Sequence, residues 1–283
     1  MKIGIIGNGF VGSSVAFGFS PQTGCDTNVK IYDKDEFKST HTLIDVVNES
    51  DFIFVSVPTP SNEDGSINTD IVEDVFDEMN QHNYRRDNIF LLRSTVTPGT
   101  TRRIQKNCRK LNIVFNPEYL TERSAKFDFI NQARFILGGK KIDTSRVASL
   151  FKWRFGESTP TIETNFETAE LIKYMNNCFL ATKVSFMNEM RLISDACGAR
   201  WEDAIEGFVR DGRVAHSHVS VPGPDGKMGF GGSCFPKDIQ AMMSFAKSMG
   251  VNPTTLRGAW KTNLKVRPER EWEKMKARAV VDD

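Results

Sequence analysis

One cysteine of this chain lies in a setting suited to nucleophilic chemistry. Cys234 belongs to the run Gly-Phe-Gly-Gly-Ser-Cys-Phe-Pro-Lys-Asp, which spans Gly229–Asp238. Glycines let main-chain atoms approach a ligand closely, and the proline opens a helical pattern, which would put Cys234 at a helix N-terminus beside Lys237. Both features favour the thiolate, which is the nucleophilic form. The run therefore predicts a candidate nucleophile, although by itself a cysteine in a glycine-rich turn is more often inert.

A second chemical signal is the glycine-rich turn Gly-Asn-Gly-Phe-Val-Gly at 7–12, which follows an apolar run and opens a helical pattern. The first and third glycines would permit a tight turn and close packing, and Gly9 would let the main chain approach a pyrophosphate. Asp33, at the end of the next β-rich run, would accept hydrogen bonds from ribose hydroxyls and repel a 2′-phosphate. The turn predicts a site for NAD rather than NADP, unless it binds nothing. Its cofactor-binding residues are Gly7, Gly9, Phe10, Val11, Gly12 and Asp33.

The elements that must position these residues change in kind along the chain. In the first half, short apolar runs alternate with helical patterns, which indicates βαβ units and a parallel sheet covered by helices on both faces. The predicted strands are Lys2–Ile6, Val29–Tyr32, Phe52–Val57, Ile89–Leu92, Ile113–Phe115 and Phe135–Leu137. The sequence thus predicts an α/β fold that opens with a Rossmann-type NAD-binding domain over residues 1–165.

The second half predicts a long helix. Glycine is absent from Thr161 to Ala196, and apolar residues recur there at steps of mostly three and four, up to a plausible stop at Gly198. About 30 helical residues would span about 45 Å, more than one small domain needs, so this helix is expected to form a homodimer interface. Its apolar stripe is Ile172, Met175, Phe179, Phe186, Met190, Ile193 and Cys197. Residues 166–283 are accordingly predicted to be a connecting helix and an all-helical dimerisation and active-site domain, with a last helix starting at Pro268.

Composition and charge exclude several classes of protein. The 283 residues include 37 Lys and Arg against 36 Asp and Glu, so the net charge of +1 gives no long-range field for nucleic acid or an anionic membrane. No apolar run approaches the roughly 18 residues that a membrane span requires. We expect neither a nucleic acid nor a membrane as partner, and a cytoplasmic protein.

The remaining metal-binding residue types indicate no metal site. The five cysteines are odd in number and lack the spacing of a zinc or redox motif, which favours reduced thiols. His216 and His218 lie close together, but no third ligand is near them in the sequence. We therefore predict that no metal is bound.

The cysteine run resembles the active-site motif of the UDP-glucose/GDP-mannose dehydrogenase family, in the form closest to its UDP-glucose 6-dehydrogenases. Four further segments are similar to that family's other blocks and occur in the same order, so the resemblance covers essentially the whole chain. These segments are 56–60 (Ser-Val-Pro-Thr-Pro), 94–99 (Ser-Thr-Val-Thr-Pro-Gly), 116–122 (Asn-Pro-Glu-Tyr-Leu-Thr-Glu) and 170–177 (Glu-Leu-Ile-Lys-Tyr-Met-Asn-Asn).

The resemblance implies an activity. Members of the family oxidise a primary alcohol of a nucleotide sugar to a carboxylate with two NAD, and the wording of the cysteine run favours UDP-glucose, giving UDP-glucuronate for polysaccharide or glycan synthesis. Cys234 would add to the aldehyde to give a thiohemiacetal, which a second oxidation turns into a thioester that water hydrolyses. Covalent capture would prevent loss of a reactive aldehyde.

The resemblance also implies catalytic roles for other residues. Lys173 and Asn177, four apart on the long helix, would address the developing oxyanion. Asp238 would transfer protons with Lys173 through water. Glu118 would activate the hydrolytic water with the help of Thr95. Without the resemblance, these side chains would be ordinary polar helix faces and a helix-capping acid.

Further residues are implied on the cofactor and substrate sides. Besides the glycine turn, the cofactor-binding residues would be Val57, Pro58, Thr59, Thr95, Glu122 and Lys237. The substrate-binding residues would be Glu118, Tyr119, Leu120, Lys173, Asn177, Arg213 and Gly231. Arg213 resembles an arginine that reaches the neighbouring subunit's sugar site.

Two departures from the family leave alternatives open. Family members continue into a second α/β domain that binds the nucleotide, and no second strand-rich half follows the helical patterns here. A separate chain could supply it, the dimer could bind the nucleotide differently, or activity could be lost. The segment between Arg213 and Cys234 is expanded, and the late basic residues Lys261, Lys265, Arg267 and Arg270 are expected to be solvated. The competing hypotheses are another two-electron Rossmann alcohol or hydroxyacid dehydrogenase, and a non-catalytic NAD-binding subunit.

Overall fold

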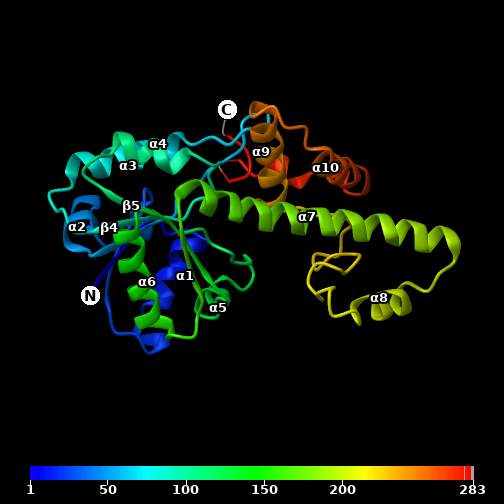
Figure 1. The fold of residues 1–283 in the computed structure, drawn as a ribbon, viewed down its shortest axis with the longest axis horizontal. Helices are drawn as coiled ribbons and strands as arrows, with labels where there is room; N and C mark the ends of the chain where they lie inside the picture. The colour runs from blue at the N-terminus through cyan, green and yellow to red at the C-terminus, as the bar shows by residue number, and fades with distance from the viewer. Residues whose placement is uncertain (277, 282–283) are drawn as a thin grey trace. The chain divides into compact units, whose positions relative to one another are not determined.

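The computed structural model describes residues 1–276 and 278–281, and the chain divides into two compact units (Figure 1). The sheet unit comprises Met1–Thr59 and Thr69–Lys173, and the helical unit comprises Pro60–Asn68 and Tyr174–Asp283.

The sheet unit is built on one seven-stranded sheet in the order β2-β1-β3-β4-β5-β6-β7. All neighbouring strands pair in parallel except β5 and β6, which are antiparallel. The strands are β1 Lys2–Ile6, β2 Asn28–Tyr32, β3 Phe52–Val55, β4 Ile89–Leu92, β5 Asn112–Phe115, β6 Phe135–Gly139 and β7 Thr161–Thr164. The predicted α/β, Rossmann-type class is confirmed, with one antiparallel pair that the alternation of elements did not indicate.

The structure corrects two details of the strands. β3 ends at Val55, because Ser56 donates the last ladder hydrogen bond to Ile6 and the next residue, Val57, bonds the Ser94 side chain. β7 was not predicted, because its sequence Thr-Ile-Glu-Thr is mostly polar and it lies at the sheet's edge, where no continuous apolar run is needed.

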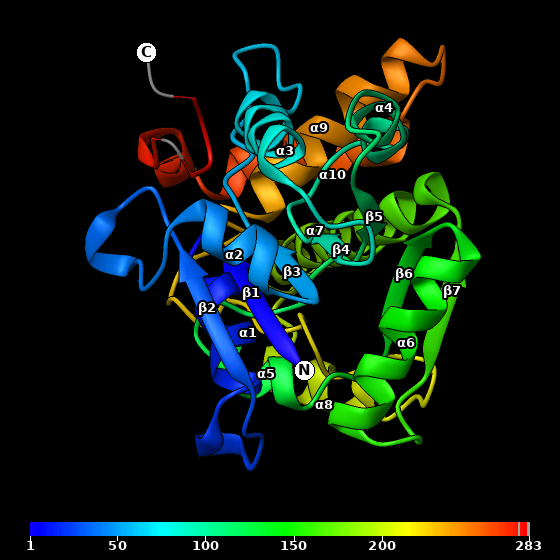
Figure 2. The ribbon, with the colours of Figure 1, turned by 90° about the vertical axis from the view of Figure 1, so that its left-hand side faces the viewer.

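Both faces of the sheet are buried by helices, as the apolar strands require. Within β3, Ile53 and Val55 face one core cluster and Phe52 and Phe54 face the other, following the two-residue period of a strand. The first cluster is covered by α2, α3 and α4 and the second by α1, α5 and α6 (Figure 2). These helices are α1 Phe10–Gly18, α2 Leu43–Glu49, α3 Asp70–His82, α4 Thr100–Asn107, α5 Ala125–Ile130 and α6 Lys141–Phe155.

The predicted long helix is confirmed. α7 spans Phe166–Cys197, 32 residues, and runs without interruption from the sheet unit into the helical unit (Figure 1). Gly198, at φ +72°, follows its last residue in the left-handed conformation that ends many helices. Among the described residues, no helix is both long and apolar enough to cross a membrane.

The rest of the helical unit packs around the middle of α7. It contains α8 Trp201–Val209, α9 Phe235–Ser248 and α10 Thr254–Val266. Tyr174 and Cys178 of α7 share a buried cluster with Phe230 and Ile239. The expected helix from Pro268 is wrong: the described residues form a 3-10 turn over Glu271–Lys274, after which Ala279 and Val281 hydrogen-bond to Ser61 along the main chain.

Candidate active site

The glycine-rich turn has the geometry that its three glycines predict. Gly7 has φ +86° and lies against the Ser56 carbonyl, and a Cβ at Gly12 would overlap the Gly7 carbonyl oxygen. A Cβ at Gly9 would meet no atom within 4 Å. Gly9 is also the N-cap of α1 and provides no side-chain cap, so the first N–H groups of the helix can bond an anion, with Phe10 and Val11 in the first turn. The turn therefore fits a dinucleotide pyrophosphate.

Asp33 lies directly after β2 and is tied to this turn. Its carboxylate accepts hydrogen bonds from the Asn8 main chain at 2.6 Å and from the Asp35 main chain at 2.9 Å. Asn8 in turn donates its side-chain amide to the Lys38 carbonyl at 2.9 Å. The carboxylate is thus held beside the turn in one orientation, and its remaining lone pairs can accept hydrogen bonds from ribose hydroxyls.

The loops after β3 and β4 are joined by Ser94. Its hydroxyl accepts from the Val57 N–H at 3.1 Å and donates to the Val57 carbonyl at 2.7 Å. Thr95 and Thr59 are buried, whereas Pro58 is exposed. The structure therefore brings these predicted cofactor-binding residues together at the carboxyl ends of neighbouring parallel strands, where open α/β sheets bind ligands.

A buried ion pair follows β5. Lys173, on the first turns of α7, donates to the Glu118 carboxylate at 2.9 Å and to the Glu118 carbonyl at 2.7 Å. The second carboxylate oxygen accepts the Leu120 N–H at 2.6 Å. The side chains of Lys173 and Glu118 are 3 % and 9 % exposed, so the two charges are largely removed from water and depend on each other.

The loop that carries Glu118 is not helical. Residues 116–121 are irregular, so Glu118 and Glu122 do not share a helix face, and Glu122 is exposed. The Lys173 ammonium lies 5.3 Å from the ring centroid of Tyr119. Burial raises the pKa of the Tyr119 hydroxyl, against the attraction of Lys173 and Arg134.

In the helical unit, Cys234 lies at the expected helix N-terminus. It is the N-cap of α9, half-buried, with Pro236 in the first turn, and its carbonyl accepts the Asp238 N–H at 2.9 Å. The Ser233 hydroxyl lies 3.8 Å from its sulfur. A thiol at this position lies at the positive end of the helix dipole, which favours the thiolate form.

Asp238 is the centre of a second buried polar cluster. The carboxylate, 1 % exposed, accepts from the Asn177 amide of α7 at 2.6 Å and from the Lys237 ammonium at 2.6 Å. Asn177 and Lys237 are themselves 6 % and 8 % exposed. The predicted catalytic residues Asn177 and Asp238 are therefore in direct contact, and Lys237 is paired with a carboxylate.

Two predicted substrate-binding residues have different surroundings. Arg213 is 90 % exposed and donates to Asp211, two residues away, at 2.9 Å. Gly231 is half-buried, and a Cβ there would overlap the Glu271 carboxylate.

The interpretation of Arg267 as solvated is wrong. Its side chain is 3 % exposed and pairs with Asp225 and Glu271, because the expanded segment before Cys234 folds back over it.

Arg93 was missed by sequence reasoning. It follows β4 directly, is 1 % exposed, and donates to the Asn116 side chain at 2.5 Å, which links the loops that carry Thr95 and Glu118. Burial lowers its pKa to about 10, against the attraction of Glu118. An arginine at the end of an otherwise apolar strand was the available signal.

Glu170 was also missed as a positioning residue. Its buried carboxylate accepts from the main-chain N–H groups of Gly99 and Thr101, at 2.6 and 2.8 Å, and so caps α4 from α7. No local sequence pattern predicts a helix cap that is supplied by a side chain about 70 positions away in the sequence.

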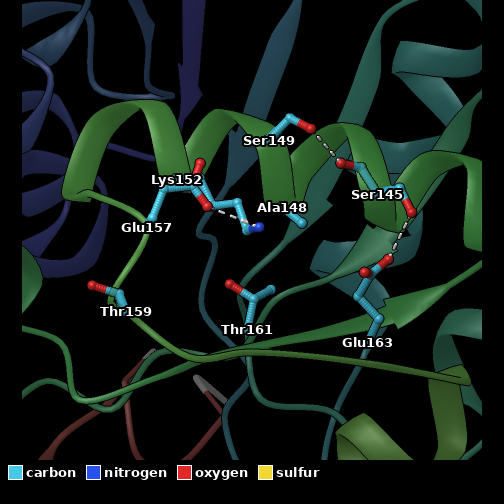
Figure 3. Close-up of a pocket in the computed structure, with 8 residues that line it drawn as sticks. All are labelled: Ser145, Ala148, Ser149, Lys152, Glu157, Thr159, Thr161 and Glu163. Carbon is cyan, nitrogen blue, oxygen red and sulfur yellow. Dashed lines mark hydrogen bonds and ion pairs between the residues drawn. The ribbon is translucent and has the colours of Figure 1, made fainter.

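A pocket of about 460 Å³ lies between α6 and the edge strand β7 (Figure 3). Its polar groups bond one another: Glu163 accepts from Ser145 at 3.0 Å, and Lys152 pairs with Glu157 at 3.0 Å. None of the predicted site residues lines it. Among residues 1–276 and 278–281, no group of three or more His, Cys, Asp or Glu could hold a metal ion.

Comparison with known proteins shows where this architecture recurs. The model of the NAD-binding domain of the UDP-glucose/GDP-mannose dehydrogenase family matches residues 26–153, and that of the central domain matches 167–265. UDP-glucose 6-dehydrogenase from Rickettsia prowazekii (strain Madrid E) is 33 % identical over 241 residues, which cover 83 % of this chain and 54 % of that protein.

Solved structures show the same fold. A UDP-glucose dehydrogenase from Pyrobaculum islandicum superposes with a TM-score of 0.79 at 26 % identity, covering 93 % of this chain and 68 % of that one. A 3-hydroxyisobutyrate dehydrogenase from Mycobacterium tuberculosis has a TM-score of 0.75 at 16 % identity over 95 % of this chain and 94 % of the other, which shows the fold alone. The chain spans about half the length of the curated relatives it matches. This chain belongs to the UDP-glucose/GDP-mannose dehydrogenase family, with that family's NAD-binding and central domains.

Proposed function

We propose that this chain is an NAD-dependent dehydrogenase that oxidises UDP-glucose to UDP-glucuronate in two steps. The observation that carries the proposal is Cys234, half-buried at the N-terminus of α9 and beside the buried Asn177–Asp238 contact, in a chain of this family. A thiolate there can hold the substrate carbon between two oxidations.

The sheet unit supplies the cofactor site in this proposal. Two NAD molecules, bound here one after the other, would each supply a hydride acceptor for one of the two oxidations. Gly9 and the first turn of α1 would bind the pyrophosphate, and Asp33 would bind the ribose hydroxyls. Thr95, Glu122 and Val57 would line the remainder of the dinucleotide site, together with Pro58, Thr59 and Lys237.

The helical unit supplies the nucleophile. The Cys234 sulfur would add to the aldehyde carbon, forming a C–S bond while the carbonyl oxygen takes up a proton to give a thiohemiacetal. Oxidation of that carbon leaves a thioester, and water displaces the sulfur to release the carboxylate. Asn177 would donate to the developing oxyanion, and Asp238 would exchange protons with Lys173 through water.

Hydrolysis of the thioester is assigned to Glu118. Each of its carboxylate oxygens accepts one hydrogen bond, from Lys173 or from the Leu120 N–H, so the group would be held in one orientation while a remaining lone pair accepts a proton from the attacking water. Tyr119, Leu120, Gly231 and Arg213 would contact the substrate, with Arg213 contributed to a neighbouring subunit.

The number of NADH formed per acid tests the proposal. The chain is incubated with UDP-glucose, GDP-mannose and UDP-N-acetylmannosamine, and NADH and the sugar acid are quantified. Two NADH per UDP-glucuronate support the thioester route. One NADH per product would instead indicate a two-electron alcohol or hydroxyacid dehydrogenase, and NAD binding without nucleotide-sugar binding would indicate a non-catalytic subunit.

The proposal includes a homodimer through α7 and a cytoplasmic location. Met175, Phe179 and Ile193, on the predicted stripe, are 61 %, 67 % and 55 % exposed, an apolar surface that a second copy would bury. All five cysteines are free, as the reducing cytoplasm would keep them. Light scattering tests the dimer: Phe179→Glu should give a monomer, whereas Phe208→Glu on α8 should not.

A further inference from the structure

The loop before Cys234 is held by side chains from three other parts of the helical unit. The main chain of 229–232 is irregular, yet the N–H groups of Gly229, Phe230 and Gly232 are each bonded by a side chain from elsewhere in the unit. These side chains come from α7, from α10 and from the turn after α10, which makes the loop's course depend on residues far away in the sequence.

Two buried asparagines hold the first part of this loop. Asn263 of α10 accepts the Phe230 N–H at 2.7 Å and donates to the Phe230 carbonyl at 3.0 Å, as a neighbouring strand would. Asn188 of α7 accepts the Gly229 N–H at 2.9 Å. Asn263 and Asn188 are 0 % and 1 % exposed, so these hydrogen bonds do not compete with water.

An ion triad holds the second part. Arg267, directly after α10, donates to Asp225 at 2.6 Å and to Glu271 at 3.0 Å, and it reaches the Met228 carbonyl at 3.3 Å. Glu271 accepts the Gly232 N–H at 3.3 Å. The guanidinium of Arg267 thus fixes the carboxylate that bonds the main chain two residues before Cys234.

The chemistry of this triad is unusual for a purely structural core. Burying the Arg267 guanidinium, whose side chain is 3 % exposed, carries a desolvation penalty that a well-packed apolar cluster would avoid, and the partly exposed carboxylates of Asp225 and Glu271 offset it. Burial opposes the charge of Arg267, but hydrogen bonds to Glu271 and Asp225 keep its pKa raised, so the triad stays ionised. Gly231 packs against Glu271 and Arg267 without room for a Cβ. The ion pairs therefore specify one position of the main chain at Gly231–Gly232.

We propose that Arg267, held between Asp225 and Glu271, is a positioning residue for Cys234. It fixes the Gly231–Gly232 main chain and so keeps the Cys234 sulfur at the N-terminus of α9. The inference rests on the proposed function, in which Cys234 is the nucleophile, and it assigns a role to the expanded segment that carries Asp225.

Alkylation of the thiols tests this positioning without any turnover. The chain is treated with iodoacetamide at pH 7, and peptide mass spectrometry follows each cysteine. Cys197, exposed at the end of α7, is the internal reference for Cys234, and buried Cys178 reports unfolding. We expect Arg267→Met to lower the Cys234-to-Cys197 rate ratio about tenfold while Cys178 stays protected, because less thiolate forms away from the helix N-terminus.

The control and a conservative variant separate positioning from general damage. Arg210→Met removes an exposed arginine that pairs with Glu206 at 2.8 Å on α8, and it should leave the ratio unchanged. Arg267→Lys keeps the charge without the planar fork and should restore part of the ratio. In turnover, Arg267→Met should lower kcat about 10- to 100-fold at unchanged KM for NAD.

The outcomes are distinct. An unchanged or higher alkylation ratio in folded Arg267→Met overturns the proposal. If that variant unfolds and exposes Cys178, Glu271→Gln decides in its place: a lowered ratio supports the proposal and an unchanged ratio overturns it. A wild-type chain that forms no NADH defeats the proposed function, but the alkylation result stands on its own.

Discussion

The sheet unit and the helical unit position their reactive side chains by different means. In the sheet unit, the loops that carry Val57, Thr95 and Glu118 leave adjacent parallel strands, so the main-chain ladder itself brings them to one edge. In the helical unit, Cys234 follows an irregular loop whose course is set by the side chains of Asn263 and Glu271. Regular backbone makes the first arrangement robust, whereas single side-chain contacts make the second sensitive to substitution.

The buried charges of the two units show the same contrast. Lys173 and Glu118 are 55 residues apart and meet because a strand end and a helix start are both anchored in the sheet unit. Lys237 and Asp238 are adjacent on α9, and Asn177 adds a long-range contact to the Asp238 carboxylate. The local pair can form with its helix, but the distant pair needs the complete sheet.

The largest expected effect is on catalysis, which we assign to the helical unit, and it should leave NAD binding by the sheet unit unchanged. Cys234→Ser should reduce formation of the sugar acid about 10⁴-fold, because the serine hydroxyl is a far weaker nucleophile at neutral pH. NAD affinity, assigned to the sheet unit, should not change. Product analysis and calorimetric titration with NAD measure the two quantities, and a parallel loss of NAD affinity would contradict the division of roles.

The next effect distinguishes folding from binding within the glycine turn. Gly12→Ala places a Cβ into the Gly7 carbonyl and should destabilise the sheet unit by about 4 kcal/mol. Gly9→Ala meets open space, so the fold should persist while NAD binding weakens through steric conflict with the pyrophosphate. Urea unfolding and NAD titration of both variants test this. Normal NAD binding by Gly9→Ala would argue against a dinucleotide at this turn.

A smaller effect compares the two buried ion pairs. Glu118→Gln leaves the Lys173 ammonium without its carboxylate and should lower the free energy of unfolding by about 3 kcal/mol. Asp238→Asn should have a smaller effect, because the amide oxygen that replaces the carboxylate can still accept the hydrogen bond from Asn177. Urea unfolding curves give both values. The reverse order would show that the sheet does not hold its charged pair more strictly than the helix does.

The smallest effect is a pH dependence in the sheet unit. Burial raises the pKa of the Glu170 carboxyl to about 7, against hydrogen bonds from Thr101 and Gly99. Because this lies above the ordinary value, the stability contribution is fully present below the unfolded-state pKa and is lost as pH rises through about 7. Glu170→Gln removes this pH-dependent loss of stability. The Tm difference, variant minus wild type, should therefore rise by about 2–4 °C from pH 5 to pH 8.

The partly exposed neighbour Glu167 provides the control for that measurement. Its hydrogen bond with Arg102 lowers the pKa of its carboxyl, so the group is ionised in both states above pH 5. Glu167→Gln should therefore shift Tm by the same amount at pH 5 and pH 8. If Glu170→Gln behaves in the same way, Glu170 does not titrate near neutral pH in the folded chain.

Local sequence patterns alone predicted much of this protein's fold. Apolar runs indicated six of the seven strands, the absence of glycine followed by Gly198 indicated α7, and the spacing around Gly9 and Asp33 indicated the dinucleotide turn. Such features follow from contacts between residues near one another in the chain, which periodicity records directly. The proline after Cys234 likewise indicated the start of α9.

Only the tertiary structure decided the rest. The antiparallel pairing of β6 with β5, the pairing of Glu118 with Lys173, and the burial of Arg267 between two acids depend on partners that no local pattern specifies. From the sequence alone, a lysine or arginine is expected to be solvated, because its charge can be buried only with a partner. In this chain the partner is a carboxylate that is distant in the sequence. Folding supplies those partners, and so it decides which polar residues of this chain become part of the candidate site.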